Sequence, residues 1–546
     1  MAAPVNPIIP GFSPDPSIVK VGEWFFLVNS TFHMFPGLPI YASQDLVSWK
    51  QIGNAIHRQS QLSLAKADTR LTPLYDGDTL TEVMASTGGL YAPTIRHHNG
   101  TFYVVCTNVI RTAAGEGRDE QPNEETENFI VSTQDIWAGH WSDPVPFQFS
   151  GIDPSLFFDD DDKVYVHGSA GPGPYTTIRQ FQIDLATGAA LSEERLLWKG
   201  TGGIYPEGPH MYRRNGWYYL VISEGGTHEG HMITTARSRS VWGPYEAYEH
   251  NPILTAKGTD AYIRYTGHCD LVEDDQGQWW GVCLGVRKDA GGRFIMGRES
   301  FVTRGTWSDD GWLTLERVAS HPSGLVRTTA SSTASTAEGQ TAAGNVDLLY
   351  IRDAHLDNYT LAGDGSAVTL TSTPVDLAAP NASPTFVGKR QRLLDGQSRV
   401  ALAAWTPETL AAWKSTGLRC GLAVFKDEHR YTRIFLDAAG DTPSIVFELV
   451  NKAQKIARTS RHDLPQGSRA LSLRIVYTER EYRLLYAASL RPDKDEGEDE
   501  DWTPLDAVDT LQLTDPDFVG PVIGVFATSA SQAKGIDVAL RGLSIQ

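Results

Sequence analysis

Three carboxylic acids stand near the start of strand-like segments that share one pattern. Asp15 lies in "SPDPSIVKV", Asp153 in "GIDPSLFFD" and Glu207 in "PEGPHMYRR", at separations of 138 and 54 residues. When acids gather in a fold, like charges and burial raise the pKa of one, while another stays ionised beside a donor or an arginine. Hydrolysis of a glycosidic bond requires one acid that holds its proton and one that has lost it. The three residues therefore form a candidate acid-base site, provided that the fold brings them together.

The same acids could instead serve structure or bind a metal. Asp-Pro pairs often begin turns, because the carboxylate accepts backbone hydrogen bonds, and this accounts for a single Asp of the kind. Three acids with His268 could hold a cation, but the sequence contains neither an H-E-x-x-H motif nor an EF-hand loop. A serine nucleophile would need a G-x-S-x-G turn, which is also absent. The four cysteines lack C-x-x-C spacing, so neither a zinc site nor a disulfide framework is indicated.

The elements that must position the acids repeat along the first 330 residues. Five times a short strand, a turn and a run of aromatic and β-branched residues follow one another, which predicts five hairpins. Their start residues are Asp15, Ala92 (preceded by Tyr91), Asp153, Glu207 and His268. A unit of about 66 residues has room for four short strands, which is one propeller blade. Innermost strands border the propeller axis, so the fold would bring the three acids to one mouth of the central tunnel.

The rest of the chain has a different composition. Residues 329–345 are almost all small polar residues, Ala and Gly, which is typical of a linker. Residues 346–546 contain alternating segments such as "RVALAAW" and "SIVFELV", which predict a β-sandwich. The predicted fold is thus all-β: a five-bladed β-propeller over residues 1–328, the linker, and a sandwich domain. The sandwich could be a sugar-binding module or a packing partner, and the sequence leaves both open.

Charge and hydropathy restrict the partners. The formal net charge is −19 without a Lys/Arg-rich run, which argues against nucleic acid, an anionic membrane surface or a polyanionic substrate. No apolar run approaches the roughly 18 to 20 residues that span a bilayer, and the N-terminus lacks the pattern of a signal peptide. We therefore expect a neutral partner.

Six stretches resemble glycoside hydrolase family 43, in its β-xylosidase and α-L-arabinofuranosidase branch. They are "NPIIPGFSPDPSIVK", "GGLYAPTIRHHNGTFYVV", "GIDPSLFFDDDDKVYV", "EGPHMYRRNGWYYLVISEGGT", "ARSRSVWGPYE" and "GRESF". The resemblance spans the first domain and implies an inverting, exo-acting hydrolase that releases a terminal pentose and requires no cofactor. By position, it implies that Asp15 is the general base and Glu207 the general acid. It further implies that Asp153 tunes the pKa of the general acid and orients it, and that Arg298 contacts substrate.

The residues of the pocket wall indicate which substrate the enzyme takes. The resemblance implies that Phe32 and Tyr91 line the pocket, and that His268 lies near the axis, where many members place a structural calcium that the histidine approaches through water. Many xylosidase members have Glu-Trp in place of His33-Met34 and Trp in place of Tyr91. Interpreting both as changes in the wall, we expect α-L-arabinofuranose side chains of arabinoxylan as the substrate. The alternative is β-xylosidase action on xylo-oligosaccharide ends.

Two functions of other classes remain: a non-catalytic carbohydrate-binding propeller and a protein-interaction scaffold. Neither accounts for three acids at equivalent positions, so we expect an enzyme whose partner is a neutral plant cell-wall polysaccharide. Enzymes that degrade polymers are usually secreted, so we expect a secreted protein, with the cytoplasm as the alternative because no signal peptide is recognisable. The oligomeric state is left open.

Overall fold

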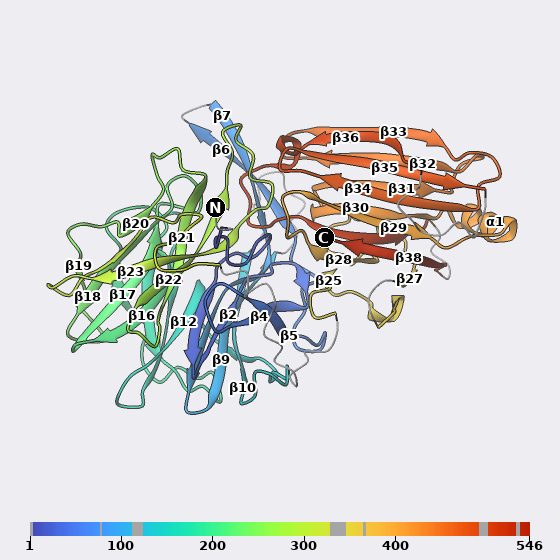
Figure 1. Cartoon of the computed structure of the whole chain (residues 1–546). Coiled ribbons are helices and arrows are strands. Elements are labelled where there is room, and N and C mark those ends of the chain that lie inside the picture. The colour runs from blue at the N-terminus through green and yellow to red at the C-terminus, as the bar shows by residue number, and fades with distance from the viewer. Residues whose placement is uncertain are drawn as a thin grey trace.

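The computed structural model describes residues 4–76, 79–111, 124–327, 345–363, 367–490, 501–530 and 535–546. Two β-rich domains lie side by side, the first coloured blue to green and the second orange to red (Figure 1). The described residues form five small sheets, two large sheets and a hairpin, which confirms the predicted all-β fold of a propeller followed by a sandwich. The predicted linker lies outside the described residues except for Asn345.

Five antiparallel sheets are the blades of the propeller. Blade 1 contains β1 (Ser17–Val21), β2 (Trp24–Val28), β4 (Gly37–Ser43) and β5 (Lys50–Ile56). Blade 2 contains β8 (Gly89–His98), β9 (Thr101–Arg111), β10 (Glu124–Thr133) and β11 (Val145–Phe147). Blade 3 contains β12 (Ile152–Phe158), β13 (Val164–Ala170), β14 (Thr177–Gln182) and β15 (Arg195–Trp198). Blade 4 contains β16 (Glu207–Arg214), β17 (Trp217–Glu224), β18 (Met232–Ser238), β19 (Glu246–Ala247) and β20 (Leu254–Thr255). Blade 5 contains β21 (Ile263–Glu273), β22 (Trp279–Arg287), β23 (Glu299–Trp307) and β24 (Leu313–Leu315).

The first two strands of each blade are the five predicted hairpins, and each pair is antiparallel. The first strands β1, β8, β12, β16 and β21 contact one another in a closed ring, so they surround the axis. The N-terminal segment lies along β23 of the last blade, where Asn6 and Val302 exchange hydrogen bonds of 2.8 and 2.9 Å. The ring is therefore closed by both ends of the propeller sequence.

At the same place in each blade, in the axial strand or just before it, a residue has a left-handed backbone. These residues are Asp15 (φ 50°), Ala92 (φ 25°), Asp153 (φ 56°), Gly208 (φ 56°) and His268 (φ 47°). In blades 2 to 5 the ladder register shifts around this residue, which is the mark of a β-bulge. A bulge redirects a side chain, and left-handed residues other than glycine concentrate at functional sites. The predicted start of blade 4 is wrong by one residue, because Gly208 holds the equivalent position and Glu207 precedes it.

The sandwich consists of two facing sheets. The first has the order β3-β25-β28-β37-β30-β31-β32-β33 and the second β26-β27-β38-β29-β34-β35-β36. The bounds in the first sheet are β3 (Met34–Phe35), β25 (Leu349–Ile351), β28 (Phe386–Arg390), β37 (Val522–Thr528), β30 (Arg419–Asp427), β31 (Arg430–Asp437), β32 (Ser444–Asn451) and β33 (Ile456–Asp463). Those in the second are β26 (Tyr359–Leu361), β27 (Val368–Thr371), β38 (Asp537–Ile545), β29 (Gly396–Leu402), β34 (Ala470–Tyr477), β35 (Glu481–Ser489) and β36 (Thr503–Asp509). Short helices occur at α1 (Pro407–Thr416), η2 (Leu356–Asn358) and η3 (Thr510–Leu513).

The two domains share a sheet. Strand β3 belongs to the first blade's sequence, yet it pairs with β25 of the sandwich through Phe35↔Tyr350 and Met34↔Ile351. The hairpin of β6 (Thr69–Asp76) and β7 (Thr79–Thr87) also joins the domains, because the backbone N–H of Thr69 donates to Glu428 of the sandwich at 2.6 Å. Propeller and sandwich are thus in direct hydrogen-bonded contact.

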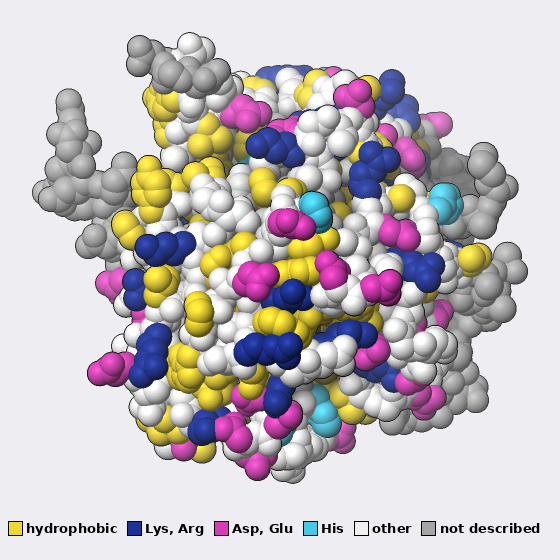
Figure 2. Space-filling model, turned by 90° about the vertical axis from the view of Figure 1, so that its left-hand side faces the viewer, with side chains coloured by type: hydrophobic (Ala, Val, Ile, Leu, Met, Phe, Trp, Pro, Cys, Tyr) yellow, Lys and Arg dark blue, Asp and Glu magenta, His cyan; other side chains and the backbone are white. Residues whose placement is uncertain are grey.

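On the face of the propeller shown in Figure 2, acidic and basic side chains are interspersed, without a broad patch of one sign. Within the described ranges, no helix is long and apolar enough to cross a membrane.

Candidate active site

One pocket of about 90 Å³ brings together all seven residues predicted for the site. The predicted residues that line it are Asp15, Asp153, Glu207, Phe32, Tyr91, Arg298 and His268. Ala92, Ile152, Thr227, His231, Leu284 and Phe518 complete the lining. A single water needs about 10 to 15 Å³ of cavity volume, so the pocket has room for several waters or one sugar ring. It has no room for a chain of sugars.

Asp15 has two neighbours that can stabilise a negative charge. It is buried, its Oδ2 accepts a hydrogen bond of 2.6 Å from Ser30 Oγ, and its Oδ1 lies 3.8 Å from Arg298 Nη1. A hydroxyl donor and a neighbouring guanidinium both stabilise negative charge on a carboxyl group. Asp15 can therefore accept a proton.

Asp153 accepts a hydrogen bond of 2.9 Å from the backbone N–H of Gly208, the residue after Glu207. Burial raises the pKa of Asp153 to about 6; the negative charge of Asp15 also raises it, and the positive charge of His268 opposes the shift. Its contact with Gly208 ties blade 3 to the bulge that presents Glu207.

Glu207 is the strongest candidate for a proton donor. Its side chain is 19% exposed. Burial raises the pKa of Glu207 to about 8; the charge of Asp153 contributes, and Arg298 opposes the rise. Glu207 therefore holds a proton at neutral pH and shares its pocket with Asp15, so the structure brings together the two residues that the sequence predicted as acid and base.

The backbone at Gly208 requires glycine. Its φ of 56° disfavours an L side chain, and a Cβ there would lie 2.8 Å from Nδ1 of His268. His268 is buried, and its backbone N–H donates to Ser223 Oγ at 2.7 Å. The imidazole thus packs under the Glu207-Gly208 bulge.

Arg298 bridges the two domains. Its Nη2 donates to Thr227 Oγ1 at 2.5 Å, and its guanidinium lies 4.4 Å from the ring centre of Phe518. Phe518 comes from the sandwich, just before β37, and its ring is 5.8 Å from Phe32 and 5.9 Å from Tyr91. The sandwich therefore supplies one wall of the pocket.

Phe32 and Tyr91 continue this aromatic wall, with ring centres 4.9 Å apart in an edge-to-face arrangement. The Tyr91 hydroxyl donates to the Thr87 carbonyl at 2.7 Å and accepts from Arg111 at 3.1 Å. Burial raises the pKa of Tyr91 to about 12, so the phenol stays neutral. The wall therefore presents apolar ring surface to the pocket.

His33 and Met34 do not line the pocket, so their interpretation as pocket-wall residues is wrong. Both are fully buried against the sandwich, His33 with its ring centre 5.8 Å from Phe425 and Met34 in strand β3. Because the chain turns into the shared sheet directly after Phe32, the next side chains face the sandwich. Of the two noted departures, only Tyr91 reaches the pocket.

A polar network lies on the axial strands, two residues or more beyond the bulges. Its members are Ser17, Arg96, Ser155, His210 and Asp270, one from each blade. The Arg96 guanidinium pairs with both Asp270 oxygens at 2.7 and 3.1 Å and lies 3.1 Å from His210 Nδ1. Ser17 donates to Asp270 at 2.6 Å, and Ser155 lies 3.0 Å from His210. Burial alone would raise the pKa of Asp270, yet Arg96 holds it far below its usual range.

Among the described residues, the axis offers no set of direct protein ligands for the calcium that the family resemblance implied. In the part of the chain that the structure describes, no three His, Cys, Asp or Glu side chains come together as metal ligands. Asp270 already pairs with Arg96, and His210, whose ring is 6.2 Å from that of His268, faces the same guanidinium. A fixed positive charge thus stands at this level of the axis.

A second, larger cavity meets the pocket at Glu207 and Ile152, which line both. It has a volume of about 1490 Å³ and runs along blades 2 and 3. Tyr205, which is 37% exposed, also lines it. We call this cavity the side groove. Glu207 is the one acid of the three that faces both spaces.

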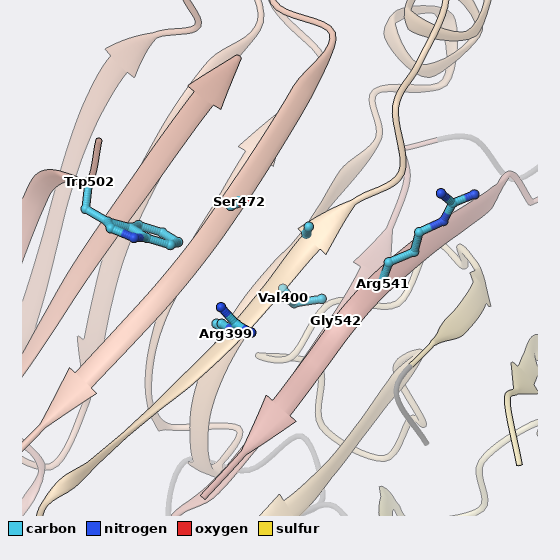
Figure 3. A pocket seen from close by; sticks show the side chains of 7 residues that line it. Arg399, Val400, Ser472, Trp502, Arg541 and Gly542 are labelled. Carbon is cyan, nitrogen blue, oxygen red and sulfur yellow. The ribbon is translucent and has the colours of Figure 1, made fainter. Parts of the chain in front are cut away.

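The sandwich has a small depression on its second sheet, lined by Arg399, Val400, Ala401, Ser472, Trp502, Arg541 and Gly542 (Figure 3). Its volume is about 10 Å³, which is the space of one water molecule. The guanidinium of Arg474 covers the Trp502 ring at 3.9 Å. This depression is too small for a sugar, so the contribution of the sandwich that the structure reveals is Phe518.

Among the lining residues that the sequence analysis missed, three have polar or aromatic side chains. Thr227 and His231 lie in "GGTHEGH", a glycine-rich loop after β17 whose polar side chains were a usable signal. Phe518 had none, because nothing in "DPDFVGP" distinguishes it from the other aromatics of the sandwich.

A five-bladed propeller that gathers three carboxyl groups, one held protonated and one beside an arginine, around a one-ring pocket defines a class of protein: the glycosidases. The family model Glycosyl hydrolases family 43 matches residues 4–313, and the Beta xylosidase C-terminal Concanavalin A-like domain matches residues 345–539. The chain belongs to glycosyl hydrolases family 43.

Known proteins match this chain over one or both domains. The non-reducing end alpha-L-arabinofuranosidase BoGH43B of Bacteroides ovatus is 33% identical over 490 residues, which cover 87% of this chain and 83% of that protein. A xylosidase/arabinosidase of Butyrivibrio fibrisolvens is 39% identical over 321 residues, 56% of this chain and 55% of that protein. Among solved structures, a xylan beta-1,4-xylosidase from Bacillus halodurans superimposes with a TM-score of 0.79 at 25% identity, covering 98% of this chain and 99% of the other. The structure titled Bacteroides ovatus Xyloglucan PUL GH43B has a TM-score of 0.78 at 28% identity and full coverage of both chains.

Proposed function

We propose that the protein is an inverting, exo-acting glycosidase that releases terminal α-L-arabinofuranose side chains from arabinoxylan. One observation carries the proposal: a pocket for one sugar ring and a long groove meet at the protonated acid Glu207. An exo-acting enzyme that trims side chains needs such a pair of spaces, one closed for the sugar released and one open for the polymer retained.

In the proposed reaction, Glu207 donates its proton to the glycosidic oxygen as the bond from that oxygen to the anomeric carbon breaks. The Asp15 carboxylate takes a proton from a water molecule, whose oxygen attacks the anomeric carbon from the opposite face and inverts it. Inverting enzymes separate the two carboxyl groups by roughly 6.5 to 9.5 Å to leave room for that water. Asp153 acts through Glu207, because its negative charge raises the pKa of the donor and keeps it protonated.

The leaving group must depart past the residue that protonates it. Glu207 lies between the two spaces, so the pocket with Asp15 and Arg298 holds the sugar released, and the side groove holds the polymer. Tyr205, two residues before Glu207, offers an exposed aromatic ring on which a backbone sugar can stack.

The choice of arabinofuranose is supported by the relative that matches over both domains, which is named an α-L-arabinofuranosidase. β-Xylosidase action on xylo-oligosaccharide ends is the second candidate, supported by the solved xylosidase with nearly complete coverage. Tyr91 and Phe518 form the wall that distinguishes a furanose from a pyranose in this proposal.

The deciding experiment measures kcat/KM on 4-nitrophenyl α-L-arabinofuranoside, 4-nitrophenyl β-D-xyloside, arabinoxylan and an arabinosylated xyloglucan. Arabinose should be the main product, and proton NMR should show an inverted anomer at early times. Glu207→Gln and Asp15→Asn should each lose most turnover while remaining folded. Xylose as the main product would replace the first candidate by the second, and a retained anomer would contradict the mechanism.

The groove has its own test. Tyr205→Ala should lower kcat/KM on arabinoxylan about tenfold, the loss of one stacking contact, and leave the small nitrophenyl substrate within twofold. Tyr175→Ala is the matched control, because Tyr175 is 77% exposed and does not line the groove. Equal losses on both substrates would contradict the assignment of the groove to the polymer.

A further inference from the structure

His231 lies against Glu207 and has no part in the chemistry described so far. It ends the loop between β17 and β18, and its ring is 1% exposed. Its backbone N–H donates to the His228 carbonyl at 2.9 Å, and its own carbonyl accepts from Thr255 Oγ1 at 2.9 Å. The ring lies flat on Gly267, where a Cβ would approach Cε1 to 2.2 Å. Glycine on the axial strand therefore makes the space for this imidazole and fixes its plane.

One hydrogen bond determines which ring nitrogen of His231 carries the proton. Nδ1 lies 3.0 Å from the carbonyl oxygen of Tyr265, and a carbonyl can only accept. Nδ1 is therefore the protonated nitrogen, and Nε2 presents a lone pair. Nε2 is buried, has no hydrogen-bond partner among the described residues, and lies 3.8 Å from Oε1 of Glu207.

The two side chains do not form an ion pair. Burial lowers the pKa of His231 to about 3, whereas burial raises that of Glu207 to about 8. Between these values both groups are neutral, so an acceptor nitrogen faces a carboxylic acid. A hydrogen bond to the neutral form of an acid disfavours its ionisation.

We propose that His231 is a positioning residue for Glu207, whose protonated carboxyl group donates to Nε2 and is thereby kept protonated until a leaving oxygen takes the proton. This inference rests on the proposed role of Glu207 as the general acid. The 3.8 Å gap closes to hydrogen-bond length when the site tightens around substrate. His231 neither gains nor loses a proton in the reaction; the proton passes from Glu207 to the glycosidic oxygen.

Other charged groups act on the same pair. Asp153 and Asp15, from blades 3 and 1, raise the pKa of Glu207, and Arg298 from blade 5 lowers it. On the side of His231, burial lowers the pKa of the imidazole most; the hydrogen bond to Tyr265 opposes the shift, and Arg298, His268 and His228 add to it. The lone pair of Nε2 is thus one contribution to the protonation of Glu207 besides the two aspartates, and it is the one that a substitution can remove without changing charge.

The experiment compares two substitutions through the pH dependence of kcat/KM. In His231→Asn, the side-chain amide can still donate to the Tyr265 carbonyl in place of Nδ1, but no atom replaces Nε2. In His231→Gln, the amide reaches the Nε2 position, where its N–H₂ can donate to an ionised Glu207, and the bond to Tyr265 is lost. Both variants should move the basic limb of the pH profile to lower pH by about one unit. At pH values above the limb, kcat/KM should therefore fall about tenfold.

The loss should be larger on substrates with a poor leaving group than on dinitrophenyl pentosides, which need little proton donation. If His231 only supports Tyr265, His231→Asn would keep the wild-type profile and His231→Gln would lose rate equally at every pH. That result would overturn the inference. His228→Asn, at a half-buried histidine of the same loop that does not line the pocket, is the control and should leave the limb unmoved.

Glu207→Gln separates this inference from the proposed function. If Glu207 is the general acid, this variant loses the basic limb and most activity on poor leaving groups. If the basic limb persists in Glu207→Gln, the proposed function is overturned. If Glu207→Gln loses the limb but His231→Asn leaves it unmoved, only the role of His231 is overturned.

Discussion

Phe518 offers the sharpest test of how the sandwich serves the pocket. In Phe518→Ala, Arg298 loses an aromatic face 4.4 Å from its guanidinium, and two ring contacts at 5.8 and 5.9 Å disappear. A cation–π contact away from water contributes about 2 kcal/mol, and each aromatic pair about 0.5 to 1.5 kcal/mol. Since these contributions overlap and water refills part of the space, we expect a net loss of about 2 to 3 kcal/mol in transition-state binding. That corresponds to a fall in kcat/KM of about 30- to 150-fold.

The assay is kcat/KM on the better nitrophenyl pentoside, with thermal unfolding to show that the variant is folded. Phe518→Leu restores most of the volume without the aromatic face and should recover less than half of the lost free energy. Leu511→Ala, on an exposed residue of the same segment and outside the pocket, should change kcat/KM by less than twofold. A folded Phe518→Ala within threefold of the wild type would show that the sandwich merely shields the pocket.

The other predictions concern the acids, the bulge and the axis. Asp153→Asn keeps an oxygen for the Gly208 N–H but removes the charge that raises the pKa of Glu207, so the basic limb of the pH profile should move from near pH 8 to lower pH. A limb that stays or rises would contradict this sign. Gly208→Ala, with a Cβ 2.8 Å from His268 and an unfavourable φ of 56°, should reduce kcat at least tenfold, checked by steady-state kinetics and circular dichroism. Because the guanidinium of Arg96 supplies positive charge at the axis, EDTA should change neither kcat/KM nor Tm; a fall that calcium restores would disprove this.

Much of the site was predictable because a repeat converts distance along the chain into a position around an axis. Asp15 and Asp153 precede strands of the same pattern, so equivalent positions meet at the axis once the five hairpins close into a ring. Glu207 was found by the same argument although it lies one residue before the equivalent position. The pattern of aromatic and β-branched residues locates a strand only to within a residue, so it did not show that Gly208, and not Glu207, is equivalent to Asp153.

What the sequence could not reveal depends on contacts between domains. Phe518 lies more than 200 residues from Arg298 in the chain, and no spacing rule connects a sandwich loop with a propeller pocket. His33 and Met34 follow a pocket residue, but strand pairing with β25 directs them away from it. The local sequence pattern predicted which strands form. Packing between distant parts of the chain decides which face of each strand is covered, and by which residues.

The polar network on the axis also has a consequence for how the propeller unfolds. The buried carboxylate of Asp270 in blade 5 has partners in three other blades. They are Ser17 of blade 1, Arg96 of blade 2 and Tyr212 of blade 4. Separation of blade 2 or blade 5 breaks the Arg96–Asp270 ion pair and leaves an unpaired buried charge, which is costly, and separation of blade 1 or blade 4 removes a hydrogen bond to Asp270. Loss of a single blade is therefore penalised even where the remaining blades keep their own sheets, so the five repeats should melt in one cooperative transition rather than one after another.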